Sequence, residues 1–476
     1  MYQKGVPGIY PLHLFCKVHS SIPSAAIRTS VRDRHRLDLH QGSLRDRRHL
    51  ERRPRRIDCI SYALENNITL LQAKLRKQST SEDRKQSQAA LLPTLSASTN
   101  QSVGYRPWTS AGTMTVTNGT VTSDVKKTYY NGSYGVNGSW TVWNGNQNIN
   151  TLKKNKVAEQ QAELTILETS NSIQEAIAKL YVQILYQTEA IEVNRQSLET
   201  SKKNEERGQQ MVAVGKMSKA DLAQLSAQRA TSEYNLVESE STLSHYKLQL
   251  KQLLEITDTS DFDVAIPVTT DEQALAEVPA MLTVYEAALT KRPEIQNAQL
   301  GVESSNLQLK IAKAGHLPTV SMTGGVGTST NSMSSNGWGE QMKTNFDASA
   351  GVSVSIPIVD GRKAKTAINK ARIAQEQARA ELLAEEKDLY STIEGFWLDA
   401  VNNQQKFRSA KASVDSEQAS YDLLQEQFNL GLKNIVELLT GKDKLLTAQQ
   451  SMLQSKYLTI YALQLLKFYQ GETLKI

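Results

Sequence analysis

The stretch Phe428-Asn429-Leu430-Gly431-Leu432-Lys433-Asn434-Ile435-Val436-Glu437-Leu438 decides the fold of this chain. It closes a long segment without proline, turns at a glycine and opens a second apolar segment. A weaker copy lies upstream, where Val214-Gly215-Lys216 is followed by Asp221-Leu222. The two glycines are 216 residues apart (position 431 minus position 215). The repeated turn indicates an internal duplication, because repeated structural units appear in a sequence as similarity at a fixed offset.

Two further pairs of motifs support the duplication. Trp143-Asn144-Gly145 returns as Val359-Asp360-Gly361 at the same offset, and Leu92-Pro93-Thr94 returns as Leu317-Pro318-Thr319. We therefore divide the chain into a basic N-terminal segment (1–57), a first structural repeat (58–280) and a second (281–476). The first repeat is expected to hold a helix (58–91), a strand pair (94–143), a long helix (145–213), a short helix (218–255) and a connector (256–280). The second is expected to hold a helix (281–316), a strand pair (317–358), a long helix (361–429) and a short helix (434–470).

The expected helices form coiled coils. A span of the length of 145–213 or 361–429 measures roughly 100 Å, and each shorter helix roughly 50–57 Å. Two short helices stacked end to end then match one long helix, so the chain supplies four columns of equal height. Apolar residues follow heptad seams, which we interpret as helix packing. These residues are Ile173, Ile177, Leu180, Ile184, Ile191 and Leu198 in the first repeat, and Val414, Tyr421, Leu424 and Phe428 in the second.

The expected strands alternate between apolar and small polar residues. In 346–358, apolar residues from Phe346 to Ile358 alternate with Asp, Ser and Gly, and 133–143 shows the same period. One interpretation is a half-buried strand of a soluble sheet. Runs of about 9–11 residues with small polar partners favour a membrane β-barrel instead. Four strands cannot close a barrel, and an open sheet edge cannot face lipid, so a membrane form must oligomerise. We read 105–130 as a long loop.

Composition excludes several functions. The chain has 476 residues and is 39% hydrophobic, with no run of about 18 apolar residues, so no transmembrane helix is expected. Residues 1–57 hold 13 Lys/Arg and 4 Asp/Glu, whereas the remainder holds 42 and 45, so the body is near neutral and nucleic-acid binding loses its support. Cys16 and Cys59 have no metal or redox spacing, and both could be free thiols. Isolated His245 and His316 give no catalytic arrangement, so no enzyme, cofactor or metal site is expected.

The N-terminal segment differs from the rest of the chain. Residues 1–57 hold five of the seven histidines and an arginine-rich run with no helical or strand period. A basic tail that binds membrane or nucleic acid is one interpretation, and a disordered tail is another. An incorrectly assigned start or an upstream frameshift fits better, so we interpret 1–57 as non-native or disordered. The chain as written carries no credible export signal or lipoprotein site.

The motifs, taken in order on a duplicated frame, resemble those of the TolC family of outer membrane efflux proteins. The resemblance covers about residues 58–476 and rests on five stretches. These are Asp58-Cys59-Ile60-Ser61-Tyr62-Ala63-Leu64-Glu65-Asn66-Asn67, Arg292-Pro293-Glu294-Ile295, Leu317-Pro318-Thr319, Ser355-Ile356-Pro357-Ile358-Val359-Asp360-Gly361-Arg362, and Phe428-Asn429-Leu430-Gly431 followed by Ile435-Val436-Glu437-Leu438-Leu439. Residues 1–57 match nothing in that family.

The resemblance implies a mixed α and β fold. A TolC-like trimeric β-barrel of 12 strands, four from each chain, would lie in the outer membrane of a Gram-negative bacterium. A long α-helical barrel would continue it across the periplasm. The homotrimer would be an exit duct of a tripartite efflux or type I secretion system, passively conducting small molecules or peptides. Its expected partners are a periplasmic adaptor (membrane fusion) protein, an inner-membrane pump and outer membrane lipid.

The resemblance also implies a site at the two turns. Family members line their constriction with an acidic residue just after the second turn, which corresponds to Glu437 here and to Asp221 in the first repeat. Three-fold symmetry would make each a ring of carboxylates that selects cations. Thr440 stands where some members have a second carboxylate, which argues against a double ring. We expect Lys433 and Lys219 to hold the turns shut by ion pairs, and we add Phe428 to the gate. For each charged residue, the alternative is an ordinary solvated helix face.

Two other sets of residues complete the expected sites. Val214, Gly215, Leu430 and Gly431 are candidates for contact with the adaptor, and both glycines suit a helix C-cap with positive φ. Trp140 and Trp143 are expected in an aromatic girdle at the membrane interface, the alternative being ordinary sheet packing. A soluble coiled-coil scaffold is the competing function. The lipid-type alternation of the strands favours the duct, because a scaffold does not need it.

Overall fold

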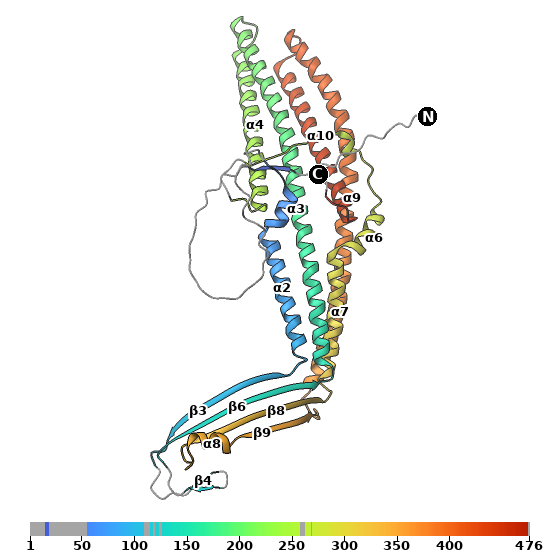
Figure 1. Ribbon diagram of the computed structural model, residues 1–476. Coiled ribbons are helices and arrows are strands. Elements are labelled where there is room, and N and C mark those ends of the chain that lie inside the picture. The colour runs from blue at the N-terminus through green and yellow to red at the C-terminus, as the bar shows by residue number, and fades with distance from the viewer. Residues whose placement is uncertain are drawn as a thin grey trace, which may run out of the picture. The chain divides into compact units, whose positions relative to one another are not determined.

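The computed structural model describes residues 15–18, 55–108, 115–117, 120–122, 126–257, 262–267 and 269–474, and Figure 1 labels their elements. The chain divides into two compact units. Unit 1 comprises residues 1–73, 166–295 and 385–476, and unit 2 comprises 74–165 and 296–384. The boundaries fall inside helices, so the two units cut across the two sequence repeats and each contains parts of both.

Unit 2 contains one antiparallel sheet of four strands, with the order β3-β6-β8-β9. The strands are β3 (Thr94–Tyr105), β6 (Thr128–Trp143), β8 (Thr319–Asn331) and β9 (Asp347–Ser355). The expected loop at 105–130 is shorter than predicted, because β6 begins at Thr128, and it holds the short strands β4 (Thr115–Thr117) and β5 (Thr120–Thr122). Helix α8 (Trp338–Thr344) lies between β8 and β9 and was not predicted.

The register of this sheet separates two chemistries by face. Residues directly opposite each other project to the same side of a sheet. Apolar rows cross the strands, such as Ala97–Val136–Val326–Ala348 and Trp140–Met322–Val352. The intervening rows are polar or glycine, such as Ser96–Asn137–Gly325–Ser349 and Thr141–Ser321–Ser353. One face of the sheet is therefore apolar, the other is polar, and most of both faces is exposed in the single chain.

The long helices are continuous. They are α3 (Gln147–Ala213) and α9 (Lys363–Asn429), each of 67 residues. The predicted heptad residues Ile173, Ile177, Ile184, Ile191 and Leu198 are buried, so most of the α3 seam is a packing surface, while Leu180 is partly exposed. In the α9 seam Tyr421 and Phe428 are buried, whereas Val414 and Leu424 are partly exposed.

Each of the two predicted helices that precede a strand pair is interrupted. The first is divided into α1 (Cys59–Asn66) and α2 (Ile68–Ala89), because the side-chain oxygen of Asn67 accepts hydrogen bonds from the backbone N–H groups of Thr69 and Leu70 and caps α2. The second is divided into α6 (Met281–Lys291) and α7 (Pro293–Ala314). Pro293 disfavours helical backbone at the residue before it, and Arg292 is extended with ψ 129°.

Unit 1 contains two helical hairpins formed by α3 with α4 (Lys219–Leu253) and by α9 with α10 (Ile435–Tyr469). The connector 256–280 holds β7 (Phe262–Val264) and α5 (Asp271–Ala274). Most of the N-terminal segment 1–57 lies outside the described residues. Within it, strands β1 (Phe15–Val18) and β2 (Arg55–Asp58) form a small antiparallel sheet with β7.

The structure bears on the bonding state of Cys59 and on whether any helix could span a membrane. Cys59 is buried and disulfide-bonded, so the possibility that it is a free thiol is excluded. No spacing of the two cysteines indicated a bond, because disulfide pairing depends on the distance between the cysteines in the fold. Among the described helices, none is both long and apolar enough to span a bilayer.

Candidate functional site

The two turns of unit 1 share one backbone geometry. Gly215 and Gly431 have φ values of +74° and +76°. After α3, the N–H groups of Gly215 and Lys216 donate to the carbonyls of Val212 and Met211 at 3.0 and 2.8 Å. After α9, Gly431 and Leu432 repeat this with Phe428 and Gln427 at 3.0 and 2.9 Å. Both are Schellman C-caps, as the glycines predicted. No atom lies within 4 Å of where a Cβ would sit at either glycine, so conformation alone requires glycine there.

Each turn is followed by a capped helix, and the cap positions one of the predicted acidic residues. Ser218 Oγ accepts from the N–H of Asp221 at 3.1 Å and donates to its carboxylate at 2.8 Å. Asn434 Oδ1 accepts from the N–H of Glu437 at 2.9 Å. Asp221 and Glu437 thus occupy the same place in the first turn of α4 and α10, where the helix dipole favours negative charge.

The carboxylates of these two residues differ in their partners. Glu437 forms an ion pair of 2.5 Å with Lys433, four residues earlier, and both side chains are partly exposed. Asp221 is instead bound by the cap hydroxyl of Ser218. The ion pair that we expected from Lys433 thus lies within one hairpin. Within a single chain, it stabilises the second turn locally.

A buried cluster fixes the second turn. Phe428 is only 3% exposed and packs with Ile435 and Leu438 inside this cluster. The other members are Leu225, Tyr421 and Leu445, with Met217 and Leu439 against them. Leu225 and Met217 belong to the first hairpin, so the cluster joins the two hairpins. Within the chain, Phe428 is therefore a packing residue, and its aromatic ring does not face an open surface.

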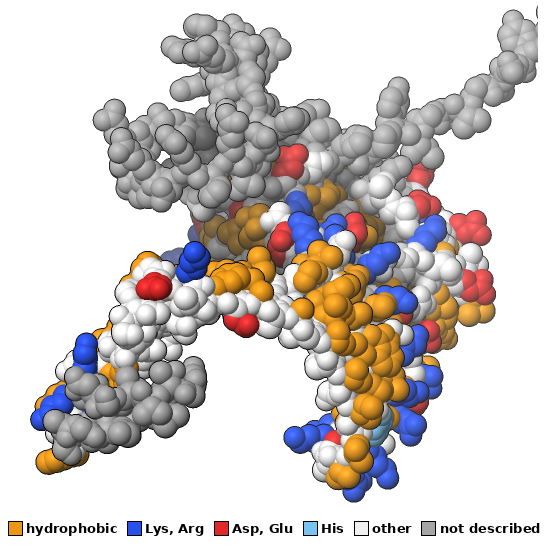
Figure 2. Space-filling view, turned by 60° about the horizontal axis from the view of Figure 1, so that its bottom comes forward, with side chains coloured by type: hydrophobic (Ala, Val, Ile, Leu, Met, Phe, Trp, Pro, Cys, Tyr) orange, Lys and Arg blue, Asp and Glu red, His pale blue; other side chains and the backbone are white. Residues whose placement is uncertain are grey.

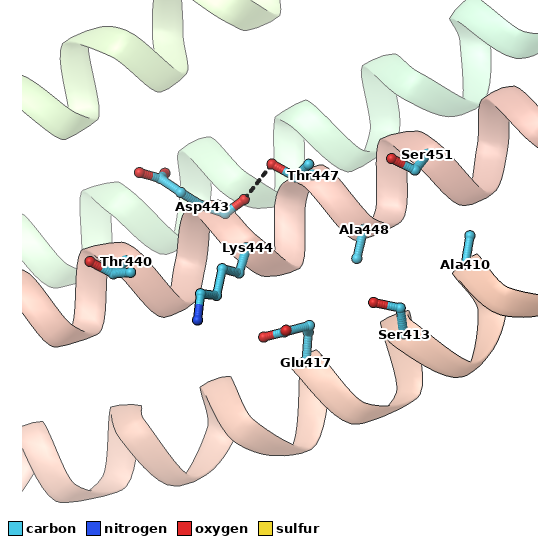
Figure 3. Close-up of a pocket in the computed structure, with 9 residues that line it drawn as sticks. All are labelled: Ala410, Ser413, Glu417, Thr440, Asp443, Lys444, Thr447, Ala448 and Ser451. Carbon is cyan, nitrogen blue, oxygen red and sulfur yellow. Dashed lines mark hydrogen bonds between the residues drawn. The ribbon is translucent and has the colours of Figure 1, made fainter. Parts of the chain in front are cut away.

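Thr440 lies on the wall of a shallow groove between α9 and α10 (Figure 3). Its hydroxyl donates to the carbonyl of Val436 at 2.8 Å, which binds it to its own helix. The groove has a volume of about 570 Å³ and carries three charged groups, from Glu417, Asp443 and Lys444. Its other lining residues are small: Ala410, Ser413, Thr447, Ala448 and Ser451. The Thr440 hydroxyl is therefore bound to its own helix, at the edge of a groove lined by charged and small side chains.

Both turns present apolar side chains to the outside. Val214 is 68% exposed and Leu430 is 73% exposed, at equivalent positions before the two glycines. Leu432 and Val436 extend this exposed apolar surface at the second turn and were not among the predicted contact residues. The exposure of all four residues could not be inferred from a helical period, because each lies in or beside a turn.

Sequence reasoning missed Lys442, a buried cation between the hairpins. Lys442 on α10 is 4% exposed, and its Nζ donates to the carbonyl of Ser197 (3.0 Å), to Ser232 Oγ (3.1 Å) and to Ser201 Oγ. Burial lowers the pKa of Lys442 to about 8. No carboxylate among the described residues forms an ion pair with it. The residues Asp443 and Lys444 follow Lys442 in the sequence, so this charged run gives no signal that Lys442 faces inward.

The motif Arg292-Pro293-Glu294 has a structural role in unit 1. The Arg292 guanidinium bonds the carboxylates of Glu294 (2.8 Å) and Glu175 (3.3 Å) and lies 4.1 Å from the centre of the Tyr469 ring. Burial raises the pKa of Glu175, while Arg292 acts in the opposite direction. This network ties α3, α7 and α10 together beside the break before Pro293.

A β-bulge in β6 brings the two predicted interface tryptophans to the same face of the sheet in unit 2. Strict alternation would put Trp140 and Trp143 on opposite faces. The register shifts between Thr141 and Trp143, so Trp143 faces Val320 while Trp140 faces Met322. Both rings therefore lie on the apolar face. The Trp140 indole N–H also donates to the carbonyl of Leu91 at 2.9 Å, which orients that ring at the helix end of the sheet.

Exposed hydrophobic side chains are concentrated in unit 2 where β9 meets α9. Ile356 is exposed, and Ile358 and Val359 are almost fully so. Figure 2 shows hydrophobic side chains gathered in contiguous orange areas on the face in view. Among the described residues, no group of three His, Cys, Asp or Glu is placed to hold a metal ion. The features that stand out in the described residues are therefore exposed apolar surfaces, capped helix ends and packing between helices.

Comparison with known proteins identifies the family. The outer membrane efflux protein family matches residues 59–254 and 284–472. Outer membrane protein TolC of Escherichia coli is 24% identical over 255 residues, covering 51% of this chain and 50% of that protein. Proteases secretion protein PrtF of Dickeya chrysanthemi is 21% identical over 267 residues, covering 55% and 56%. The chain thus spans about half the length of these curated relatives.

A solved structure shares the fold. The outer membrane protein VceC of Vibrio cholerae aligns with a TM-score of 0.71 at 16% identity, covering 87% of this chain and 96% of that one. Together with the family match, this confirms the resemblance and the mixed α and β fold class predicted from the sequence.

Proposed function

We propose that this chain, which belongs to the outer membrane efflux protein family, forms an exit duct in the outer membrane of a Gram-negative bacterium. Three copies would form one tube, with the sheets in the membrane and the helices in the periplasm. The tube would passively conduct small molecules or peptides that an inner-membrane pump delivers through a periplasmic adaptor. The name of the protease secretion relative supports a secretion role beside efflux.

The two-faced sheet is the observation that carries this proposal. Its apolar rows suit lipid, and its polar rows suit a water-filled lumen. In the described sheet β3 and β9 are edge strands, each paired on one side. An unpaired edge in lipid leaves backbone groups without hydrogen bonds, at several kcal/mol each. Pairing β9 of one copy with β3 of the next would satisfy both edges, and three copies would give 12 strands.

The helical hairpins supply the periplasmic part of the proposal. A helix of 67 residues is roughly 100 Å long. Such helices could line a passage, and their turns would lie at its far end. Exposed Val214 and Leu430, beside Gly215 and Gly431, would contact the adaptor.

The constriction would lie at the same turns. Three-fold symmetry would bring together three copies of Glu437, and separately three copies of Asp221, as rings of carboxylates that attract cations. Lys433 would partly neutralise the Glu437 ring through its 2.5 Å ion pair. Thr440, whose hydroxyl donates to the carbonyl of Val436, would line the passage without charge. Phe428 would act indirectly, by holding the second hairpin against the first.

Membrane fractionation and native mass of the detergent-extracted protein test the duct. We expect the chain in the outer membrane fraction, as a trimer that conducts ions across a planar bilayer. A soluble monomer would overturn the proposal and would favour a coiled-coil scaffold. A membrane trimer without conductance would also contradict an exit duct.

A further inference from the structure

The apolar face of the sheet changes character towards the end remote from the helices. Val136 opposite Val326 is the last row with two aliphatic side chains. The next two rows on the same face are Tyr134 opposite Thr328 and Gly132 opposite Thr330. Hydroxyl groups thus replace aliphatic groups where the apolar band ends.

Helix α8 covers this end of the apolar face. Thr328 Oγ1 donates to the carbonyl of Met342 at 2.9 Å. The Trp338 ring meets the Tyr134 ring edge-on, with centroids 6.2 Å apart and an interplanar angle of 90°. Thr330, two residues further along β8 on the same face, is buried. Because Thr328 and Tyr134 project from the same side as Val326 and Val136, α8 lies on the apolar side of the sheet.

Gln341 fixes α8 in this place. Its side-chain amide donates to the carbonyls of Asn331 and Asn336 at 3.0 and 2.7 Å, and its oxygen accepts from the N–H of Asn331 at 2.8 Å. Asn345 adds a hydrogen bond of 2.7 Å to the carbonyl of Ser329. These four hydrogen bonds fix the orientation of α8 on the sheet. The exposed side chains of α8 therefore point in a fixed direction.

The exposed groups of this segment are large and apolar. Trp338 is 57% exposed, and Phe346, just past α8, is 61% exposed. Exposed Lys343 lies between them in the sequence. Aromatic rings with a lysine nearby suit the boundary between lipid headgroups and acyl chains.

The spacing along β6 agrees with a bilayer. Tyr134, the partner of Trp338, and Trp143 are nine positions apart on this strand. This is roughly 30 Å along the strand. At a strand tilt of about 40°, the height is roughly 23 Å, close to the apolar band of about 25 Å between the aromatic girdles of outer membrane barrels.

We propose that α8 is an interfacial lipid-binding helix. Trp338 and Phe346 enter the headgroup–acyl boundary at the edge of the membrane opposite Trp140 and Trp143, and α8 fixes the depth of that edge. The partner is the bilayer surface itself. This inference rests on the proposed membrane-spanning sheet.

Tryptophan quenching by brominated lipid tests the proposal. The chain has five tryptophans, so each single reporter requires changing the other four to phenylalanine. Three variants retain only Trp338, only Trp140 or only Trp397, and each trimer is reconstituted in phosphatidylcholine vesicles brominated either near the headgroup or near the chain end. We expect Trp338 and Trp140 to be quenched more strongly by the shallow bromine, and Trp397 of α9 to be quenched by neither.

Two contrary outcomes are distinguishable. If Trp140 is quenched by lipid bromine while Trp338 is quenched only by aqueous acrylamide, α8 does not bind lipid and the barrel stands. If neither is quenched by lipid, the membrane sheet itself is overturned. Should a multiply substituted chain fail to form trimers, the difference in quenching between the parent and Trp338→Phe gives the same quantity.

Gln341→Ala tests whether α8 presents the ring. Loss of its three hydrogen bonds should reduce the lipid quenching of Trp338 and leave that of Trp140 unchanged. Unchanged quenching of Trp338 would show that Gln341 does not orient α8. It would overturn the defined presentation on which the proposal depends.

Discussion

The two helical hairpins of unit 1 repeat one backbone design in different surroundings. Helices α4 and α10 both have 35 residues, and both follow a Schellman turn with a side-chain cap. Yet α4 buries four residues and α10 buries 18. Both hairpins meet in one hydrophobic cluster, but the second supplies five of its six buried members, whereas the first supplies only Leu225. The buried Lys442 also belongs to the second hairpin and donates hydrogen bonds to serines of the first. The two repeats therefore share the same local turn and cap geometry. They differ in packing, because α10 is much more buried than α4.

The largest expected effect is at the clustered side of the second turn. Phe428→Ala removes a ring that is 3% exposed, and we expect it to destabilise the α9–α10 hairpin by about 3–5 kcal/mol. The matched change at the first turn, Val212→Ala, removes a partly exposed side chain and should cost about 1 kcal/mol or less. Hydrogen exchange of the turn amides measures both changes. Equal effects would contradict the asymmetry between the hairpins.

Lys442 makes the second hairpin sensitive to pH. Its pKa falls from 10.5 to about 8 through burial, so between pH 8 and 10.5 the unfolded chain binds more protons at this lysine. The free energy of unfolding should therefore rise with pH across this window, by about 3 kcal/mol in total. Urea unfolding at pH 7.5, 9 and 10.5, compared with Lys442→Met, measures this contribution. A Lys442→Met difference that stays constant with pH would remove Lys442 from this role.

The two turn glycines should respond alike. Gly215→Ala and Gly431→Ala each force a side chain into positive φ without a steric contact, so each should cost about 1–2 kcal/mol. Thermal unfolding of both variants checks the equality. A much larger loss at Gly431 would mean that the cluster, as well as the backbone, requires this turn geometry.

The exposed charges should have the smallest effect on stability and a specific effect on conductance. Glu437→Ala breaks an exposed pair with Lys433, which costs about 0.3–0.5 kcal/mol. If the proposed ring exists, the same change should lower the block of single-channel current by divalent cations. Asp221→Ala, the matched position, should have a weaker effect if the second turn is the narrower one. Unchanged block in Glu437→Ala would exclude that residue from the constriction.

Local features could be predicted from particular residues. Gly215 and Gly431 indicated C-caps because few other residues adopt positive φ easily. The heptad seam of α3 indicated its buried side, since packing follows helical period. The breaks at Asn67 and Arg292 were missed, although an N-cap residue and a following proline are the signals that could have revealed them.

Only part of the candidate site could be predicted from the sequence. The acidic positions Asp221 and Glu437 were found through the repeat, but their partners depend on side-chain geometry that no spacing encodes. Three features could not be predicted: the burial of Lys442, the packing of α8 on the sheet and the face on which Trp143 lies. The first two depend on contacts with elements distant in the chain, and the third depends on a single bulge.

The sequence by itself determined the duplicated order of strands and helices, the turn glycines and the two-faced alternation of the strands. These are set by the conformational limits of single residues and by periods of 3.6 and 2, which act over short distances. Only the tertiary structure decided which hairpin is buried, which lysine lies between helices, and which face Trp143 joins. Those outcomes depend on contacts between residues far apart in the chain, whose energies exist only once the elements are packed together.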